Sequence, residues 1–145
     1  MIFKETFIKG MFIVKLKPHH DLRGFFSRAW CKKEMERVGL NGELAQCNLS
    51  FTKKIGVIRG LHYQLRPHED DRFFRCMRGQ IFDVCVDLRK DSPSYLKWFG
   101  TKLDGDSFDA VYIPKGCAHG FQTLSTKVLA YYHVSEFYQP NYERG

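Results

Sequence analysis

Two histidines lie in similar surroundings in separate parts of the chain and could act on the same small molecule. His62 lies in the run Gly60–Gln64 and His119 in the run Pro114–Phe121, each beside glycine in an apolar, strand-like context. Imidazole is the side chain best suited to take up a proton near neutral pH. A small barrel whose two halves each deliver one imidazole to a common cavity would be an enzyme that moves protons.

Short strand-like runs separated by turn residues make up most of the chain. They are expected at residues 2–8, 11–16, 44–51, 56–63, 72–77, 80–87, 95–103, 109–113, 118–124 and 127–138. The only helix is expected from Cys31 to Val38, with Gly39 as its stop signal. Many short strands at this spacing predict an all-β antiparallel sandwich or barrel. Since no linker or repeat interrupts residues 1–145, we expect a single domain.

One predicted strand carries acidic residues on one of its faces. Ile81, Asp83, Cys85 and Asp87 alternate with Phe82, Val84, Val86 and Leu88. Because side chains of a strand alternate between its faces, we expect the second, wholly apolar set to face the core. Asp83 would then look toward a polar cavity or solvent, where its carboxylate could orient a histidine or an arginine.

The formal net charge of +7 raises the question of an anionic partner. The basic residues are scattered and form no basic arm, so a small phosphorylated ligand is favoured over nucleic acid. No N-terminal stretch reads as a signal peptide and no apolar run approaches the length of a membrane span, so no membrane partner is expected. The five cysteines show no CxxC spacing and indicate reduced thiols in the cytoplasm.

Seven segments, in order along the chain, resemble the dTDP-4-dehydrorhamnose 3,5-epimerase family. They are Asp21–Phe26, Gln46–Ser50, Gly56–Gln64, Arg75–Val84, Val86–Arg89, Tyr112–Pro114 and Ala118–Phe121. The RGLHYQ and AHGF sequences within them are the most specific. The resemblance implies a cupin-type jelly-roll barrel, a homodimer, and no metal or organic cofactor. It also implies a substrate that is a nucleotide-linked 4-keto-6-deoxy sugar, inverted at carbons beside the ketone.

The resemblance also implies roles for individual residues. His62 would be the base and Tyr132 the acid, with Tyr131 and Tyr138 as alternatives for the exposed phenol. Tyr138 would stack on the nucleotide base. The residues that would hold the nucleotide or sugar are Arg23, Gln46, Asn48, Arg59, His119 and Glu143. His62 could instead be a core histidine, and His119 could be purely structural. The remaining histidines, His19, His20, His68 and His133, are interpreted as surface residues.

Three departures from the family pattern bear on the chemistry. Arg72 stands where the family has a lysine near the ketone oxygen, and it could still stabilise an enolate. Ser27 stands where the family has a glutamate that helps to read the nucleotide base. The chain ends at Gly145, before the position of the family's aspartate that pairs with the catalytic histidine. We therefore expect another acid at His62, with Asp83 as first candidate and Glu143 as second; a partner subunit could also supply it.

Two alternatives to an epimerase remain open at this point. A nucleotide-sugar 3,4-ketoisomerase would use similar proton transfers on a similar barrel, and a non-catalytic cupin would bind the nucleotide sugar without converting it. A metal site, common among cupins, is disfavoured because Gln64 stands where a second histidine of a His-x-His motif would be.

Overall fold

Strands that are apolar on at least one face pair into two antiparallel sheets that face each other. The computed structural model describes residues 1–145. The strands are β1 (Ile2–Glu5), β2 (Phe12–Lys15), β3 (His19–Asp21), β4 (Gly24–Phe26), β5 (Gln46–Thr52), β6 (Ile58–Gln64), β7 (Arg72–Arg78), β8 (Gln80–Asp87), β9 (Trp98–Asp104), β10 (Ala110–Ile113), β11 (Cys117–Thr123), β12 (Val128–Val134) and β13 (Glu143–Arg144). The one helix is α1 (Lys32–Arg37).

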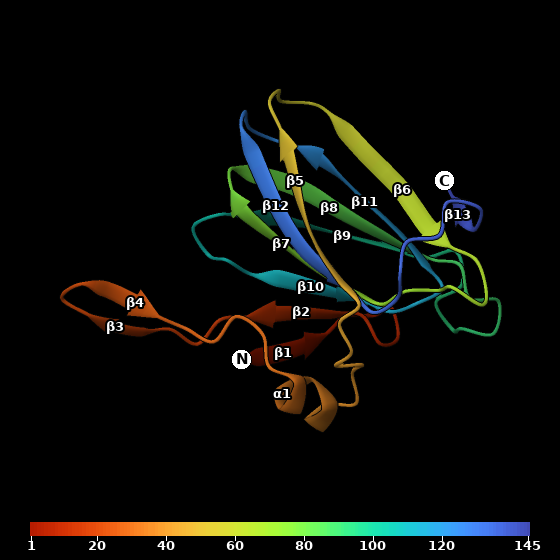
Figure 1. Cartoon of the computed structure of the whole chain (residues 1–145), viewed down its shortest axis with the longest axis horizontal. Coiled ribbons are helices and arrows are strands. Elements are labelled where there is room, and N and C mark those ends of the chain that lie inside the picture. The colour runs from red at the N-terminus through yellow and green to blue at the C-terminus, as the bar shows by residue number, and fades with distance from the viewer.

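The two large sheets form a jelly-roll barrel. One sheet has the strand order β1-β2-β10-β7-β12-β5 and the other β13-β6-β11-β8-β9. Side chains from both sheets fill the space between them, and one buried cluster contains Ile81 and Cys85 of β8 together with Phe74 and Cys76 of β7. At one end of the barrel β5 and β6 diverge, and the chain terminus at β13 lies beside β6 (Figure 1). The predicted cupin-type fold is confirmed.

Each expected element corresponds to one in the structure, but the expected runs 2–8 and 127–138 end early, at Glu5 and Val134, and the expected run 95–103 begins late, at Trp98. The helix is within one residue of its expected start and end, and Gly39, with φ +78°, follows it in the left-handed conformation that ends helices. The strands β3, β4 and β13 were not predicted. They have only two or three residues each, too few for an alternating pattern to be visible.

The hairpin of β3 and β4 projects from the barrel as a separate arm (Figure 1). Its side chains are strongly exposed, at 107% for Leu22 and 73% for Phe26. Apolar side chains left in water at the tip of an arm favour a contact with another surface.

The prediction for the faces of β8 is wrong. Ile81, Asp83, Cys85 and Asp87 are the buried set, each at most 1% exposed, whereas Phe82, Val84 and Val86 are only half-buried on the outer face. Burial of the two carboxylates is possible because each one is paired: Asp87 accepts hydrogen bonds from Arg89, Ser92 and Ser94, and Asp83 has a partner described below.

The prediction that His133 is a surface residue is also wrong. Its side chain is buried between Phe73, stacked at a centroid distance of 5.6 Å, and Trp30. Its Nδ1 has no hydrogen-bond partner. Burial and the nearby Arg75 charge hold the pKa of His133 below its ordinary value.

Candidate active site

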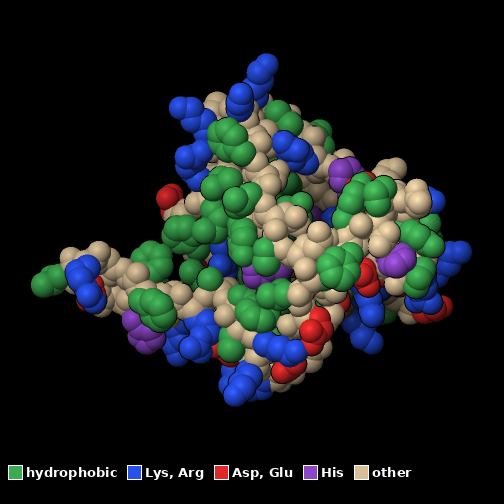
Figure 2. All heavy atoms as spheres, viewed as in Figure 1, with side chains coloured by type: hydrophobic (Ala, Val, Ile, Leu, Met, Phe, Trp, Pro, Cys, Tyr) green, Lys and Arg blue, Asp and Glu red, His purple; other side chains and the backbone are tan.

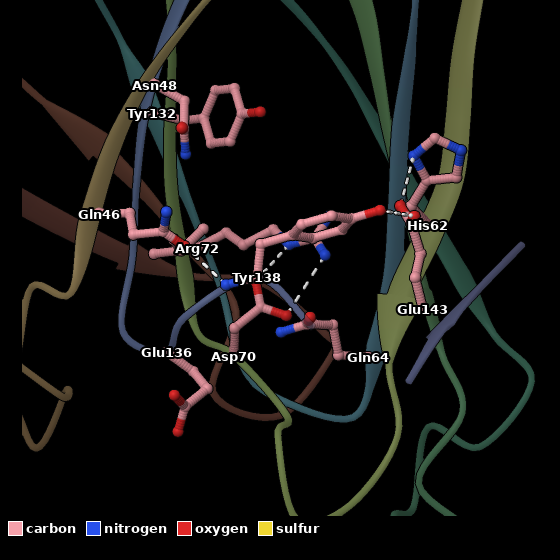
Figure 3. A pocket seen from close by; sticks show the side chains of 11 residues that line it. Gln46, Asn48, His62, Gln64, Asp70, Arg72, Tyr132, Glu136, Tyr138 and Glu143 are labelled. Carbon is pink, nitrogen blue, oxygen red and sulfur yellow. Dashed lines mark hydrogen bonds and ion pairs between the residues drawn. The ribbon is translucent and has the colours of Figure 1, made fainter. Parts of the chain in front are cut away.

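Two adjoining cavities open between the sheets, and three side chains line both of them. These three are His62 from β6, Arg72 from β7 and Tyr132 from β12. The outer cavity is completed by Gln46, Asn48, Gln64, Asp70, Val134, Glu136, Tyr138 and Glu143 (Figure 3), and the inner one by Ser50, Arg59, Phe74, His119, Gly120 and Phe121. His62 and Tyr132 come from opposite sheets and so stand on opposite walls.

A glycine lies near each histidine because the backbones of β6 and β11 approach closely at these positions. A Cβ on Gly60, whose φ is +101°, would lie 2.6 Å from the carbonyl oxygen of His119, and a Cβ on Gly120 would lie 2.5 Å from that of Arg59. Larger residues would therefore force β6 and β11 apart. With glycine at both positions the strands pair with His119 opposite His62, so the two imidazoles reach the same cavity.

His119 is held by a buried carboxylate. Its Nε2 lies 2.7 Å from Asp83 Oδ2, and the two side chains are 4% and 0% exposed. The prediction that Asp83 serves His62 is therefore wrong, since its strand directs it to the other histidine. The broader expectation that Asp83 orients a histidine is confirmed. The pairing fixes which nitrogen of His119 faces Asp83 and leaves the other edge of the ring free.

His62 is half-exposed and faces a different acid. Glu143 Oε1 lies 3.6 Å from His62 Nδ1, and the side chain of His62 is 51% exposed, which excludes a core histidine. Glu143 reaches it because β13 pairs with β6, with Glu143 opposite Gln64. Tyr138 Oη donates a hydrogen bond of 2.6 Å to the other carboxylate oxygen, which raises the pKa of Tyr138 (Figure 3). Of the two candidate acids, Glu143 is the one that lies within ion-pair distance of His62.

The segment that carries Tyr138 is tied to both sheets by amide side chains. The backbone N–H of Tyr138 donates to Gln46 Oε1 at 2.6 Å, and that of Gln139 donates to Gln64 Oε1 at 2.7 Å. Asn48 follows on β5, on the same wall as Gln46. The Tyr138 ring is exposed at the mouth of the outer cavity, where a flat ring could stack on it.

Two arginines from different strands line the inner cavity. Arg59 Nε donates to Thr52 Oγ1 at 2.9 Å and its Nη2 to the carbonyl of Phe51, so the side chain spans from β6 to β5. Arg72 is bound to Asp70, with Nε 2.6 Å from Oδ2 and Nη2 3.3 Å from Oδ1. Both guanidinium groups keep further N–H donors for an anionic ligand.

Two predicted site residues, Arg23 and Asp83, line neither cavity, and of these only Asp83 contacts a residue that does, namely His119. Arg23, between β3 and β4, lies far from this contact (Figure 1). Its side chain is 89% exposed on the projecting arm and is paired with Asp21. Sequence reasoning assigned no role to Gln64, Asp70 or Glu136, which all line the outer cavity. The sequence did contain a signal for Asp70: residues two apart on a strand point to the same side, so its carboxylate could have been expected beside Arg72.

The side chains of the chain form no group of three or more His, Cys, Asp or Glu residues with the geometry of a metal site. No helix has the length and hydropathy needed to cross a membrane. All five cysteines are free.

The jelly-roll barrel, with two adjoining cavities between its sheets, has the architecture of a cupin-type protein. Residues 5–145 match the model of the family described as dTDP-4-dehydrorhamnose 3,5-epimerase. A dTDP-4-dehydrorhamnose 3,5-epimerase of Shigella flexneri is 42% identical over 142 residues, which cover 97% of this chain and 78% of the relative. The chain therefore belongs to the dTDP-4-dehydrorhamnose 3,5-epimerase family.

Solved structures agree with this assignment. The family member from Bacillus anthracis, with TDP and PPi bound, superposes with a TM-score of 0.96 at 37% identity, over 99% of this chain and 82% of that one. The enzyme from Legionella pneumophila in complex with dTDP-4-keto-L-rhamnose has a TM-score of 0.91 at 35% identity, over 98% and 75% of the two chains. The resemblance read from the sequence motifs is confirmed.

Proposed function

We propose that this protein is a cofactor-independent isomerase that epimerises a nucleotide-linked 4-keto-6-deoxy sugar at C3, C5 or both. The observation that carries the proposal is the position of His62 and Tyr132 on opposite sheets, both lining the same cavities. Inversion of a carbon needs a base on one face of the sugar ring and a proton donor on the other. Family membership and the ligands of the similar structures support the substrate class.

The reaction follows from the positions of these groups. His62 takes the proton from the carbon beside the ketone, the electron pair of that C–H bond forms a C=C bond to the carbonyl carbon, and the π pair of the C=O bond moves onto the oxygen to give an enolate. Glu143 stabilises the imidazolium that forms. Arg72 supplies hydrogen-bond donors for the developing negative charge, and His119 would add a donor at Nδ1 when it is doubly protonated beside Asp83. Tyr132 then delivers a proton to the opposite face of the carbon.

We assign the nucleotide portion to the rim of the outer cavity. Tyr138 would stack on the base, and Gln46 and Asn48 would bind the adjoining polar groups. Arg59 would bind the diphosphate, because a guanidinium forms two parallel hydrogen bonds to phosphate oxygens. Thermal-shift measurements with the diphosphates of thymidine, cytidine, guanosine and uridine would identify the base, since a ligand that binds only the folded state raises its stability.

Incorporation of solvent deuterium into a dTDP-4-keto-6-deoxy sugar tests the catalytic proposal. The parent protein should label the carbons beside the ketone and invert them. His62→Ala should abolish exchange, whereas Tyr132→Phe should exchange without inversion, because only the opposite-face donor is lost. A 3-keto product would identify a 3,4-ketoisomerase instead. A protein that binds the nucleotide sugar and exchanges nothing would be the non-catalytic cupin.

We also propose that residues 1–145 act as one domain in a homodimer. Figure 2 shows hydrophobic side chains gathered over β5 and β12 and along the projecting arm, and Leu49 on β5 is 70% exposed. The strand β1, which ends the six-stranded sheet, offers an edge to the partner's sheet. Docking of the arm on a second copy would also give Arg23 a ligand-binding role there. Light scattering that finds a 17.0 kDa species at micromolar concentration would refute the dimer.

Five free cysteines are typical of a protein that acts in the reducing cytoplasm. Nucleotide sugars would be its ligands there. We propose no nucleic-acid or membrane partner. Fractionation of cells that produce the protein would test this.

A further inference from the structure

The Arg72–Asp70 pair is a largely enclosed ion pair in which both residues line the outer cavity. The two side chains are 17% and 4% exposed, and two nearly parallel N–H···O contacts of 2.6 and 3.3 Å join them. Arg72 is also one of the three residues that line both cavities, together with His62 and Tyr132. The orientation of its guanidinium therefore bears directly on the proposed reaction.

Asp70 itself is held in place by the next residue. The backbone N–H of Asp71 donates to Ser135 Oγ at 2.8 Å, and its carbonyl accepts from the N–H of Ser135. The carboxylate of Asp71 accepts from the backbone N–H of Lys115 at 3.0 Å and from Asn41 Nδ2 at 2.9 Å. These bonds attach the start of β7 to three other segments, so the Asp70 carboxylate projects from a firmly held backbone.

The pair leaves one side of the guanidinium free. Asp70 takes Nε–H and one N–H of Nη2, which leaves both hydrogens of Nη1 and the second of Nη2 without a protein acceptor. A free arginine side chain samples many rotamers, and fixing them when a ligand binds has an entropic cost. An arginine already fixed by Asp70 would not lose that entropy when it binds the substrate.

Resting on the proposed function, we propose that Asp70 is a positioning residue for Arg72. It holds the guanidinium so that a free Nη–H donates to the ketone oxygen as the enolate forms, while Asp70 itself does not touch the reacting atoms. The same arrangement makes arginine, rather than lysine, the required cation. A lysine at this position would carry a single ammonium that Asp70 would draw away from the oxygen.

The kinetic test compares four variants in the deuterium-exchange assay. Asp70→Ala should lower kcat by roughly 10- to 30-fold with little change in KM, less than the roughly 10²–10³-fold that loss of the oxyanion donor itself would cause, because Arg72 is still present. Asp70→Asn, which keeps one acceptor oxygen, should retain more of the rate than Asp70→Ala. Arg72→Lys should be slow, and Asp70→Asn/Arg72→Lys should be faster than Arg72→Lys, because the ammonium is released from its carboxylate. A merely structural role for Asp70 would not give this rescue.

A measurement that needs no turnover checks the pair itself. The ¹⁵Nε–H resonance of Arg72, identified by its loss in Arg72→Lys, should be protected from exchange with water in the parent and exposed in Asp70→Ala. Equal protection in both proteins, or kcat of Asp70→Ala within threefold of the parent, would overturn the inference. A parent protein that exchanges no deuterium would refute the proposed function first, and with it any role of Asp70 in the reaction.

Discussion

Removing Asp83 tests whether the buried His119–Asp83 pair supports the cavity. In Asp83→Ala, the Nε2 of His119 would lose its partner in a side chain that is only 4% exposed. An unsatisfied buried polar group costs about 1–3 kcal/mol, and breaking a buried ion pair by removing one partner costs about 3–5 kcal/mol. Asp83 Oδ1 already lacks a partner, so its removal also relieves a cost. We therefore expect a loss of about 2–3 kcal/mol in the free energy of unfolding.

Further variants separate the stability that comes from the His119–Asp83 interaction from the stability that each side chain contributes alone. His119→Ala should cost more than Asp83→Ala, at about 3–5 kcal/mol, because it leaves a fully buried carboxylate uncompensated. Asp83→Asn keeps an acceptor for His119 and should cost about 1 kcal/mol. In Asp83→Ala/His119→Ala the losses should fall short of their sum by about 1–3 kcal/mol. Asp21→Ala on the exposed arm should leave stability unchanged and serves as the control.

Urea unfolding monitored by tryptophan fluorescence measures these differences in the free energy of unfolding. Incorporation of solvent deuterium into the sugar substrate, measured with the same variants, reports whether the cavity is intact. If Asp83→Ala unfolds at the same urea concentration as the parent, or if the two single losses add fully, the pair contributes nothing and the argument from burial fails. A slower exchange rate in Asp83→Asn with unchanged nucleotide affinity would add that the pair also sets the position of His119.

Three further predictions follow from particular contacts. Arg59→Ala should weaken binding of a nucleoside diphosphate by about 1.5–3 kcal/mol, the range for a hydrogen bond to a charged group, and unchanged affinity in calorimetry would place the anion site elsewhere. The folded-state pKa of His133 lies below its unfolded value near 6.5. The protein should therefore keep its full stability above about pH 6.5 and lose stability as the pH falls from there toward the folded-state pKa, because the unfolded chain takes up the proton first. Thermal unfolding between pH 7 and pH 5 should show a smaller loss of stability in His133→Phe than in the parent, whereas His19→Phe on the exposed arm should behave like the parent. Gly120→Ala should destabilise the fold by about 1–3 kcal/mol and lower exchange, since its Cβ would press on the backbone of β6, and wild-type stability would contradict the close approach.

The sequence alone determined the strand pattern, the family and most of the cavity. Alternating apolar residues between turn signals identified the long strands because side-chain direction along a strand repeats every two residues. The sequence showed a glycine near His62 and another beside His119, but the structure was needed to show that these glycines permit the close pairing of β6 and β11. Six of the seven residues expected to bind substrate, all but Arg23, line one of the two cavities, as do His62, Arg72 and Tyr132.

Only the tertiary structure decided which groups meet. Alternation divides the side chains of β8 between two faces, one apolar and one that carries Asp83 and Asp87, but it does not say which face is buried. In the structure the buried face is the one with the carboxylates, because Asp83 finds a partner on β11 and Asp87 finds partners in the loop after β8. The acid at His62 likewise depends on β13 folding back along β6, a contact between distant segments that no local pattern encodes. Pairing of a charge is a property of three-dimensional neighbours, and a buried carboxylate without such a partner would be too costly to keep.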